Sequence, residues 1–323
     1  MQNVRGHLKL SLKKFLKTIY AHFISTIFPS RLARDQTFFG LWERKGFHIT
    51  PISFEEPIPD TRTLKDDIWR AQSELIGIKM DVQGQIELLS RFSSRFKEEY
   101  DRFPRNKTLI PSQYYTNNGA FAYVDSEILY CMIRYLKPKR IIEIGSGNST
   151  YLSAQAILKN KEDNIVCQLE AIEPHPNDVL KAGFPGLSNL IVKNVQDVPV
   201  SEFSKLKNTD ILFIDSSHCL KIGSDVEYEI LEILPRLNKG VVVHFHDIFL
   251  PKEYPKKWVM DGFRFLNEQY MLQAFLTFND SFEVLWASSY MALCYPDKLE
   301  SAFNSYKRNF QIPPGSFWIR KTK

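Results

Sequence analysis

The sequence predicts an α/β fold for residues 106–323, a mostly parallel sheet with helices on both faces. Two observations predict this fold. Short apolar runs alternate with helical stretches, which is the pattern of successive βαβ units. The runs are almost continuously apolar, as strands covered on both faces are. The runs that we expect to form strands are residues 140–144, 167–172, 190–192, 211–214, 241–245, 282–286 and 316–320.

Helices are expected between these strands. Asp125 is a residue type that caps helices, so a helix is expected to begin there and to run to Leu136. A second helix is expected over residues 149–159, directly after a glycine turn, and a third over residues 263–278. The sequence shows no internal repeat and no low-complexity tract.

Residues 35–105 are predicted to form an N-terminal extension that is irregular at first and then helical. Three prolines interrupt residues 35–65, so no long helix is expected there. Apolar residues recur at helical spacing from Thr63 to Tyr100. Two prolines follow this region, and we therefore place the domain boundary near residue 105.

Residues 1–34 form a separate basic segment. They hold seven Lys and Arg residues and no Asp or Glu, whereas the rest of the chain holds 35 basic and 37 acidic residues. The net charge of +5 is thus concentrated at one end, and we expect no nucleic-acid partner for the main body. A basic end on a near-neutral body predicts a local surface interaction instead.

Residues 8–28 are predicted to form an amphipathic helix. One face carries apolar residues at spacings of three and four, and the lysines lie off that face. The helix is therefore expected to lie on an anionic membrane surface, and the alternative is a helix packed on the body or on a partner chain. The apolar face consists of Leu8, Leu12, Phe15, Ile19, Phe23 and Ile27.

Composition excludes several other classes of protein. Hydrophobic residues make up 44% of the chain and charged residues 24%, which argues against wholesale disorder and against a polytopic membrane protein. None of the four cysteines forms a CxxC pair, so a zinc knuckle or a redox motif is not expected. With no convincing secretory signal, we expect a cytoplasmic protein, peripheral at the inner face of the membrane if the basic helix binds there. The oligomeric state is left open.

The strongest functional signal is the glycine turn at residues 143–147. A predicted strand ends there, Gly145 and Gly147 allow a ligand to approach the backbone closely, and a helix begins at once with free N–H groups. Glu173 ends the next strand, 26 residues past Gly147, where an acid accepts hydrogen bonds from ribose hydroxyls in doubly wound sheets. Thr150 stands where an NAD site has its third glycine, and no P-loop motif follows. The turn therefore predicts a nucleoside cofactor other than NAD or ATP.

Four motifs together resemble the class I S-adenosylmethionine-dependent methyltransferases. Within that class the chain resembles the bacterial family that includes macrocin-type sugar O-methyltransferases and cephalosporin-hydroxylase-like proteins, over residues 106 to about 322. The motifs are EIGSGNST at Glu143–Thr150, EAIEP at Glu170–Pro174, FIDSSH at Phe213–His218 and HFHDIFLP at His244–Pro251.

The resemblance implies a Rossmann-like sheet of seven strands whose last strand is antiparallel. It also implies that S-adenosylmethionine is the cofactor, with Asp197 at the adenine edge. The other residues implied to contact the cofactor are Glu143, Gly145, Ser146, Gly147 and Glu173.

Polar residues follow two neighbouring strands of the predicted sheet. Asp215 and His218 follow residues 211–214, and His246 and Asp247 follow the next strand. Ligands bind at this edge in such sheets, so we expect these side chains to converge there. His244 lies within its strand and is expected to be structural.

Two chemistries fit this convergence. Asp215, His246 and Asp247 suit a divalent metal such as Mg²⁺, and Asp215, His246 and His218 suit catalysis by a general base. The resembling sugar enzymes bind magnesium through an Asp after one strand and an acidic pair after the next. Here that pair is replaced by His246–Asp247, so both chemistries stay open.

The expected reaction is methylation of a hydroxyl on a sugar or glycan-like acceptor. Methyl transfer needs an aligned nucleophile, and an alcohol must also lose its proton to a base or a metal-bound group. Tyr254 and Trp258, in a loop after the strand, are expected either to stack on the sugar or to pack in the core. The alternatives are a non-catalytic adenosylmethionine-fold scaffold in glycan assembly, and a metal-dependent hydroxylase or oxidase.

Overall fold

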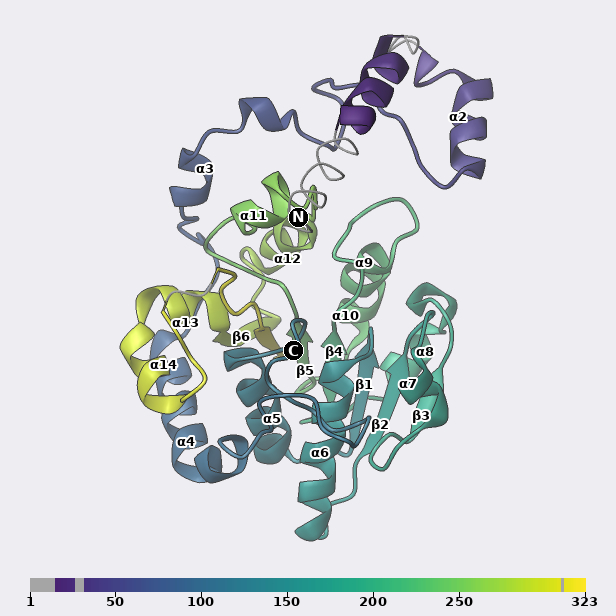
Figure 1. Ribbon diagram of the computed structural model, residues 1–323. Coiled ribbons are helices and arrows are strands. Elements are labelled where there is room, and N and C mark those ends of the chain that lie inside the picture. Colours follow the sequence, from purple (N-terminus) through teal and green to yellow (C-terminus); the bar gives the residue numbers. More distant parts are fainter. Residues whose placement is uncertain (1–14, 27–31, 309–310) are drawn as a thin grey trace, which may run out of the picture. The chain divides into compact units, whose positions relative to one another are not determined.

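A computed structural model describes residues 15–26, 32–308 and 311–323 (Figure 1). The chain divides into two compact units, residues 1–65 and residues 66–323. Residues 8–14 and 27–28 of the predicted amphipathic helix lie outside the described residues, and residues 15–26 are helical as predicted. No helix in the described parts of the chain is both long and apolar enough to cross a membrane.

The first unit has almost no interior of its own. After the helix over residues 15–26 come α2 (Gln36–Arg44), which Asp35 caps, and the short 3-10 helix η2 (Thr61–Thr63). Among the unit's described residues, Ala33 alone is buried. The described residues between and beside these two short helices have irregular structure.

The second unit is built on one sheet of seven strands. Their order is β3-β2-β1-β4-β5-β7-β6, and β7 is antiparallel to both of its neighbours while the other pairs are parallel. The predicted Rossmann-like class I methyltransferase fold, with its antiparallel last strand, is therefore confirmed. The strands are β1 (Arg140–Ile144), β2 (Gln168–Ile172), β3 (Asn189–Ile191), β4 (Ile211–Ile214), β5 (Val242–Phe245), β6 (Phe282–Ala287) and β7 (Phe317–Lys321).

Helices cover both faces of this sheet. Successive side chains of a strand point to opposite faces, and here both faces are apolar and must be buried. In β1, Ile141 belongs to a core shared with α4 (Val82–Tyr100), α5 (Val124–Leu136) and α6 (Asn148–Glu162). Ile142 belongs to the opposite core. The remaining helices are α7 (Asp178–Ala182), η3 (Val195–Asp197), α8 (Val200–Phe203), α9 (Asp225–Glu227), the π-helix η4 (Tyr228–Ile233), α10 (Leu234–Arg236), α11 (Lys256–Met260), α12 (Glu268–Leu276), α13 (Ser288–Cys294) and α14 (Pro296–Ala302).

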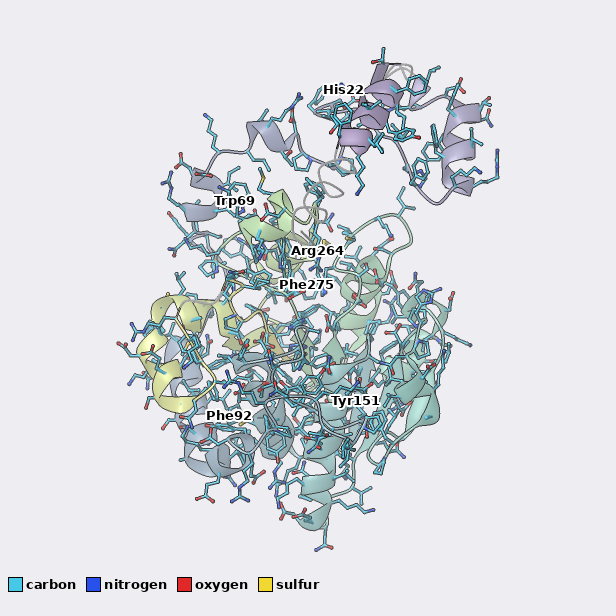
Figure 2. The ribbon with its side chains drawn as sticks, viewed as in Figure 1. His22, Trp69, Phe92, Tyr151, Arg264 and Phe275 are labelled. Carbon is cyan, nitrogen blue, oxygen red and sulfur yellow. The ribbon has the colours of Figure 1, made fainter. Side chains whose placement is uncertain are left out.

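The helical part of the extension is shorter than predicted. Only α3 (Asp67–Arg70) and the long helix α4 form, because Leu75 and Gly77 have left-handed backbone angles (φ 51° and 81°) that no helix continues through. Asp81 then accepts a hydrogen bond from the backbone N–H of Gly84 and caps α4. Phe92, labelled in Figure 2, is fully buried on α4 and attaches the extension to the main core.

Two expectations about helix ends are wrong. Asp125 does not cap α5 but lies in its first turn, where its carboxylate accepts hydrogen bonds from the backbone N–H groups of Gly315 (2.8 Å) and Ser316 (2.9 Å). The predicted helix over residues 263–278 is reduced to α12, since Phe263 and Phe278 have positive φ angles (52° and 56°). In both places distant backbone contacts and turns override the local pattern.

Candidate functional site

The glycine turn after β1 is packed against the end of β4. Gly145 has φ +77°, and a Cβ atom there would lie 1.9 Å from the backbone oxygen of Asp215. Its N–H donates to the carbonyl of Ile172 at the end of β2. Only glycine satisfies both the backbone angle and this contact, so the residue joins three strand ends at the site.

Glu143 orients the start of α6 from inside the core. Its carboxylate accepts hydrogen bonds from the hydroxyls of Ser149 (2.6 Å) and Thr150 (3.0 Å). Burial raises the pKa of Glu143 to about 8, and these two hydrogen bonds partly offset that rise. Its Oε2 atom is buried and has no hydrogen-bond partner within the described structure, and the same holds for the hydroxyl of Ser146. Two polar atoms of the predicted cofactor loop are therefore buried without a partner in the described structure, beside the cavity residues Ile144 and Gly145.

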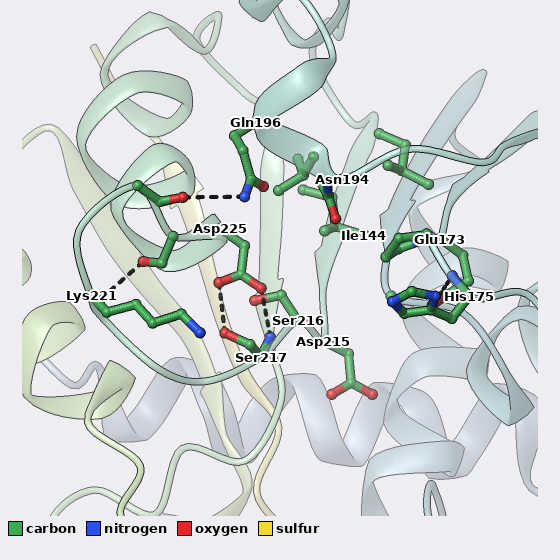
Figure 3. A pocket seen from close by; sticks show the side chains of 16 residues that line it. Ile144, Glu173, His175, Asn194, Gln196, Asp215, Ser216, Ser217, Lys221 and Asp225 are labelled. Atoms are coloured by element: carbon green, nitrogen blue, oxygen red, sulfur yellow. Dashed lines mark hydrogen bonds between the residues drawn. The ribbon is translucent and has the colours of Figure 1, made fainter. Parts of the chain in front are cut away.

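A cavity of about 450 Å³ opens at the ends of β1, β2 and β4 (Figure 3). Gly145, Glu173 and Asp215 are among its lining residues. Glu173 accepts hydrogen bonds from the backbone N–H groups of Ser146 (3.1 Å) and His175 (2.8 Å), which fix the carboxylate at the rim. The cavity volume is within the ordinary range for small-molecule and cofactor sites.

The structure does not bring Asp197 to this cavity. Its side chain is exposed and accepts a hydrogen bond from Asn194. Asn194 and its neighbour Gln196 line the cavity instead. The 3-10 helix η3 places Asn194 and Gln196 at the cavity and Asp197 in solvent. The apolar pattern of the sequence does not predict this short helix.

The loop after β4 forms the opposite wall. Asp225 accepts hydrogen bonds from the backbone N–H (2.9 Å) and the hydroxyl (2.6 Å) of Ser217, and Figure 3 shows Asp225 and Glu173 on opposite sides of the cavity. Ser216 donates a hydrogen bond to Glu229 on the π-helix η4. The sequence analysis missed Asp225 and Glu229, because their contacts depend on how this loop folds back.

Four predicted side chains converge beside the cavity. Oδ1 of Asp215 lies 3.2 Å from Nε2 of His218 and 3.3 Å from Nδ1 of His246. Oxygens of Asp247 lie 3.6 Å from each of these two ring nitrogens. The predicted convergence of the two strand ends is thus confirmed, with Asp215 belonging both to the cluster and to the cavity wall.

Two further carboxylates contact the other ring nitrogens of the two histidines. Glu268, at the first turn of α12, lies 2.7 Å from Nδ1 of His218. Asp125 lies 3.8 Å from Nε2 of His246. Each imidazole therefore has three carboxylates beside it, and Asp215 and Asp247 are shared by both rings. Glu268 follows Asp247 by 21 residues, and Asp125 precedes His246 by 121 residues. Spacing in the sequence therefore does not assign either of them to the cluster.

The pKa values of the cluster follow from these contacts. Burial alone would lower the pKa of both imidazoles. Asp215 and Glu268 nevertheless raise the pKa of His218 well above the usual value, and Asp215, Asp247 and Asp125 do the same for the pKa of His246. Burial alone would raise the pKa of Asp215, but the two rings hold it well below its usual range. Burial raises the pKa of Asp247. These pKa shifts favour protonated imidazoles paired with the ionised carboxylate of Asp215.

Backbone strain accompanies the cluster. His218 and Asp247 both have left-handed backbone angles (φ 58° and 55°) at the ends of β4 and β5. Such angles are uncommon for residues other than glycine, and they concentrate at functional sites, where surrounding contacts maintain them. The hydrogen bond between the backbone N–H of Asn267 and the carbonyl of His218 is one such contact.

The predicted metal site stays a prediction. No group of three or more His, Cys, Asp or Glu side chains in the described parts of the chain is placed to hold a metal ion. Nδ1 of His246 lies 3.3 Å from Asp215 and 3.6 Å from Asp247, so it faces both carboxylates. The arrangement suits a proton relay.

Two other predicted side chains are structural. His244 is fully buried in β5, stacks on Phe213 at 3.9 Å between ring centroids and pairs with the hydroxyl of Ser316. Tyr254 is also buried, and its hydroxyl accepts a hydrogen bond from the backbone N–H of Gln269. Tyr254 thus packs in the core and is not free to stack on a sugar.

Comparison with known proteins gives this site a family. Residues 142–248, which hold the glycine turn and Asp215, His218, His246 and Asp247, match the family model described as "Methyltransferase domain". An uncharacterised protein of Archaeoglobus fulgidus is 32% identical over 176 residues, which are 51% of this chain and 77% of that protein. The chain belongs to the family of this archaeal protein and carries a methyltransferase domain. The domain holds every residue that lines the cavity.

Several solved structures are similar at lower identity. The plantazolicin methyltransferase BamL, solved with a desmethyl-plantazolicin analogue and S-adenosylhomocysteine, is 14% identical, with a TM-score of 0.40 over 75% of this chain and 96% of that chain. An apo structure of CmcI is 15% identical, with a TM-score of 0.36 over 70% and 84% of the two chains. An O-methyltransferase from Bacillus cereus is 10% identical, with a TM-score of 0.34 over 73% and 91%. Similarities this distant carry no argument about individual residues.

Proposed function

We propose that this protein is an S-adenosylmethionine-dependent O-methyltransferase that acts on a hydroxyl of a sugar or glycan-like acceptor. The observation that carries the proposal is the double position of Asp215. It lines the 450 Å³ cavity and lies within 3.3 Å of both imidazoles of the cluster. A methyl donor in the cavity and a hydroxyl at the cluster would therefore meet at this residue.

The cavity residues support the cofactor. Glu173 accepts hydrogen bonds from the ribose hydroxyls, the role that an acid at this strand end has in doubly wound sheets. The unpartnered Oε2 atom of Glu143 and the hydroxyl of Ser146 are buried next to the glycine turn and suit the polar amino-acid end of the cofactor. Asn194 and Gln196, and not Asp197, are proposed for the adenine edge, because they line the cavity.

The cluster supports proton removal from the acceptor. When bound, adenosylmethionine supplies a methyl group whose bond to sulfur breaks as the new bond to the acceptor oxygen forms. Because neighbouring carboxylates raise the pKa of His246, the neutral ring forms only at high pH, and in that form it accepts the hydroxyl proton; turnover is therefore expected to rise with pH. Asp215, 3.3 Å away, stabilises the imidazolium that results. Asp125 holds the opposite edge of the ring, and Glu268 does the same for His218. The proposed steps use no metal, because no group of three or more His, Cys, Asp or Glu among the described residues is placed to hold one.

A second cavity supports a sugar-like acceptor. It measures about 390 Å³ and adjoins the first turn of α5, where Tyr123 and Glu127 flank Asp125 in the sequence. Aromatic side chains and the amides of Asn117 and Asn304 line it. Aromatic faces together with a few fixed polar groups are the usual lining of small-molecule sites.

An acceptor screen with paired variants tests the proposal. Sugars and glycans would be incubated with labelled adenosylmethionine, with and without a chelator. His246→Ala is expected to lower turnover roughly 10²–10⁴-fold, with cofactor binding unchanged because His246 does not line the cavity. The chelator is expected to leave turnover unchanged. Loss of activity on chelation, restored by Mg²⁺, would contradict the metal-free mechanism, and absence of any cofactor binding would contradict the proposal as a whole.

A further inference from the structure

The helix over residues 15–26 exposes a continuous apolar face. At about 100° per residue, its large apolar side chains fall on one half of the circumference. Lys17, His22 (labelled in Figure 2) and Ser25 fall on the other half. The exposed fractions on the apolar half are 62% for Phe15, 47% for Leu16, 49% for Ile19, 67% for Tyr20, 63% for Phe23 and 51% for Ile24.

The unit that contains this helix has little core with which to cover it. Ala33 is the one buried residue among the described residues of the unit. Further apolar side chains of the unit are exposed as well, with Ile52 at 65% and Phe54 at 98%. Contiguous apolar surface of this kind marks an interaction site in a stable protein.

The charge around the helix indicates which partner fits. Residues 1–34 hold seven basic residues and no acidic one, and Lys17 lies on the polar half of the helix itself. A partner must therefore combine an apolar layer with negative charge beside it. The surface of an anionic lipid bilayer does so, with acyl chains below and acidic head groups above.

We propose that the helix over residues 15–26 binds in the plane of an anionic membrane surface, with Phe15, Ile19 and Phe23 toward the acyl chains. Lys17 and the other cations of residues 1–31 contact the head groups, whereas Arg34 pairs with Glu56. The methyltransferase domain is thereby held where acceptors attached to or assembled at a membrane are concentrated. That last step depends on the proposed function, whereas the membrane contact does not.

Vesicle flotation of the full chain tests the contact with two matched variants. Phe23→Glu and Ser25→Glu add the same residue to the same helix, one on the apolar half and one on the polar half. Phe23→Glu is expected to lower partition into phosphatidylglycerol vesicles at least tenfold, because it loses both apolar contact and charge attraction. Ser25→Glu is expected to lower it by roughly fivefold or less, the electrostatic share alone. Binding is expected to weaken with salt and to be lost on phosphatidylcholine vesicles.

Three outcomes would overturn this inference. They are equal losses in the two variants, equal binding to neutral vesicles, and no flotation of the wild-type chain. A self-associating wild type that Phe23→Glu makes monomeric, without flotation, would assign the face to a second copy of the chain. Cofactor binding measured on the same variants is expected to be unchanged, which separates this result from any failure of the proposed function.

Discussion

Replacing Gly145 by alanine tests the contact that joins the glycine turn to β4. The change has two costs. A non-glycine residue at φ +77° costs about 1–2 kcal/mol. The new Cβ atom would also lie 1.9 Å from the backbone oxygen of Asp215, so the turn or β4 must move by more than an ångström, which costs about 1–3 kcal/mol in a packed interior. We therefore expect the free energy of unfolding to fall by about 2–5 kcal/mol.

Gly183→Ala is the matched control for this experiment. Gly183 has nearly the same backbone angle (φ +71°), but a Cβ atom there meets nothing within 4 Å. It follows α7 and does not line the cavity. The control should therefore show only the cost of its own backbone conformation (φ 71°, ψ 162°), which other residues rarely adopt, about 1–3 kcal/mol.

Urea unfolding and calorimetric titration with S-adenosylhomocysteine measure the two effects. Gly145→Ala is expected to be the less stable variant and to bind the ligand at least tenfold more weakly, because Asp215 must shift. Gly183→Ala is expected to bind as the wild type does. If the two variants lose equal stability and both bind normally, the close packing of the turn against β4 has no consequence and the reasoning is refuted.

Three further predictions concern single carboxylates. Glu173→Ala is expected to weaken S-adenosylhomocysteine binding roughly tenfold or more by calorimetry, whereas Asp197→Ala, outside the cavity, is expected to leave it unchanged. Glu143 has a pKa of about 8 when folded against 4.5 unfolded, so its stabilising contribution is complete below pH 4.5 and is lost as the pH rises to about 8. Glu143→Gln does not titrate and is expected to gain stability over the ligand-free wild type across this window in urea unfolding; a constant difference would refute the raised pKa. Asp125→Asn is expected to lower turnover roughly tenfold or more with cofactor binding intact. Asp210→Asn is not, although its buried carboxylate also accepts backbone N–H hydrogen bonds, because it lies at the other end of β4; equal kinetics would remove Asp125 from the relay.

The sheet and the glycine turn could be predicted from the sequence because their signals are local. An apolar run such as residues 211–214 has no stable alternative to a buried strand, and a turn with Gly145 followed by a helix has few other conformations. The convergence of Asp215 with His246 followed from the same logic, since neighbouring parallel strands end at one edge.

The remaining parts of the site depend on contacts that no local pattern contains. Asp125 was expected to cap α5, yet its carboxylate binds backbone N–H groups 190 residues later and reaches His246. Glu268 contacts His218 across 50 residues. Asn194 lines the cavity and Asp197 does not, because the short helix η3 turns the chain between them. The residues of the predicted metal set, Asp215, His246 and Asp247, lie together at the two strand ends, and the metal itself stays a prediction.

Calorimetric titration of the full chain with S-adenosylhomocysteine and, separately, with NAD tests the central claim most directly. The account predicts that S-adenosylhomocysteine binds at one site per chain, that Glu173→Ala weakens this binding, and that NAD gives no heat of binding. Binding of NAD without binding of S-adenosylhomocysteine would contradict the proposed cofactor, because the cavity beside Gly145 and Glu173 would then serve a different one.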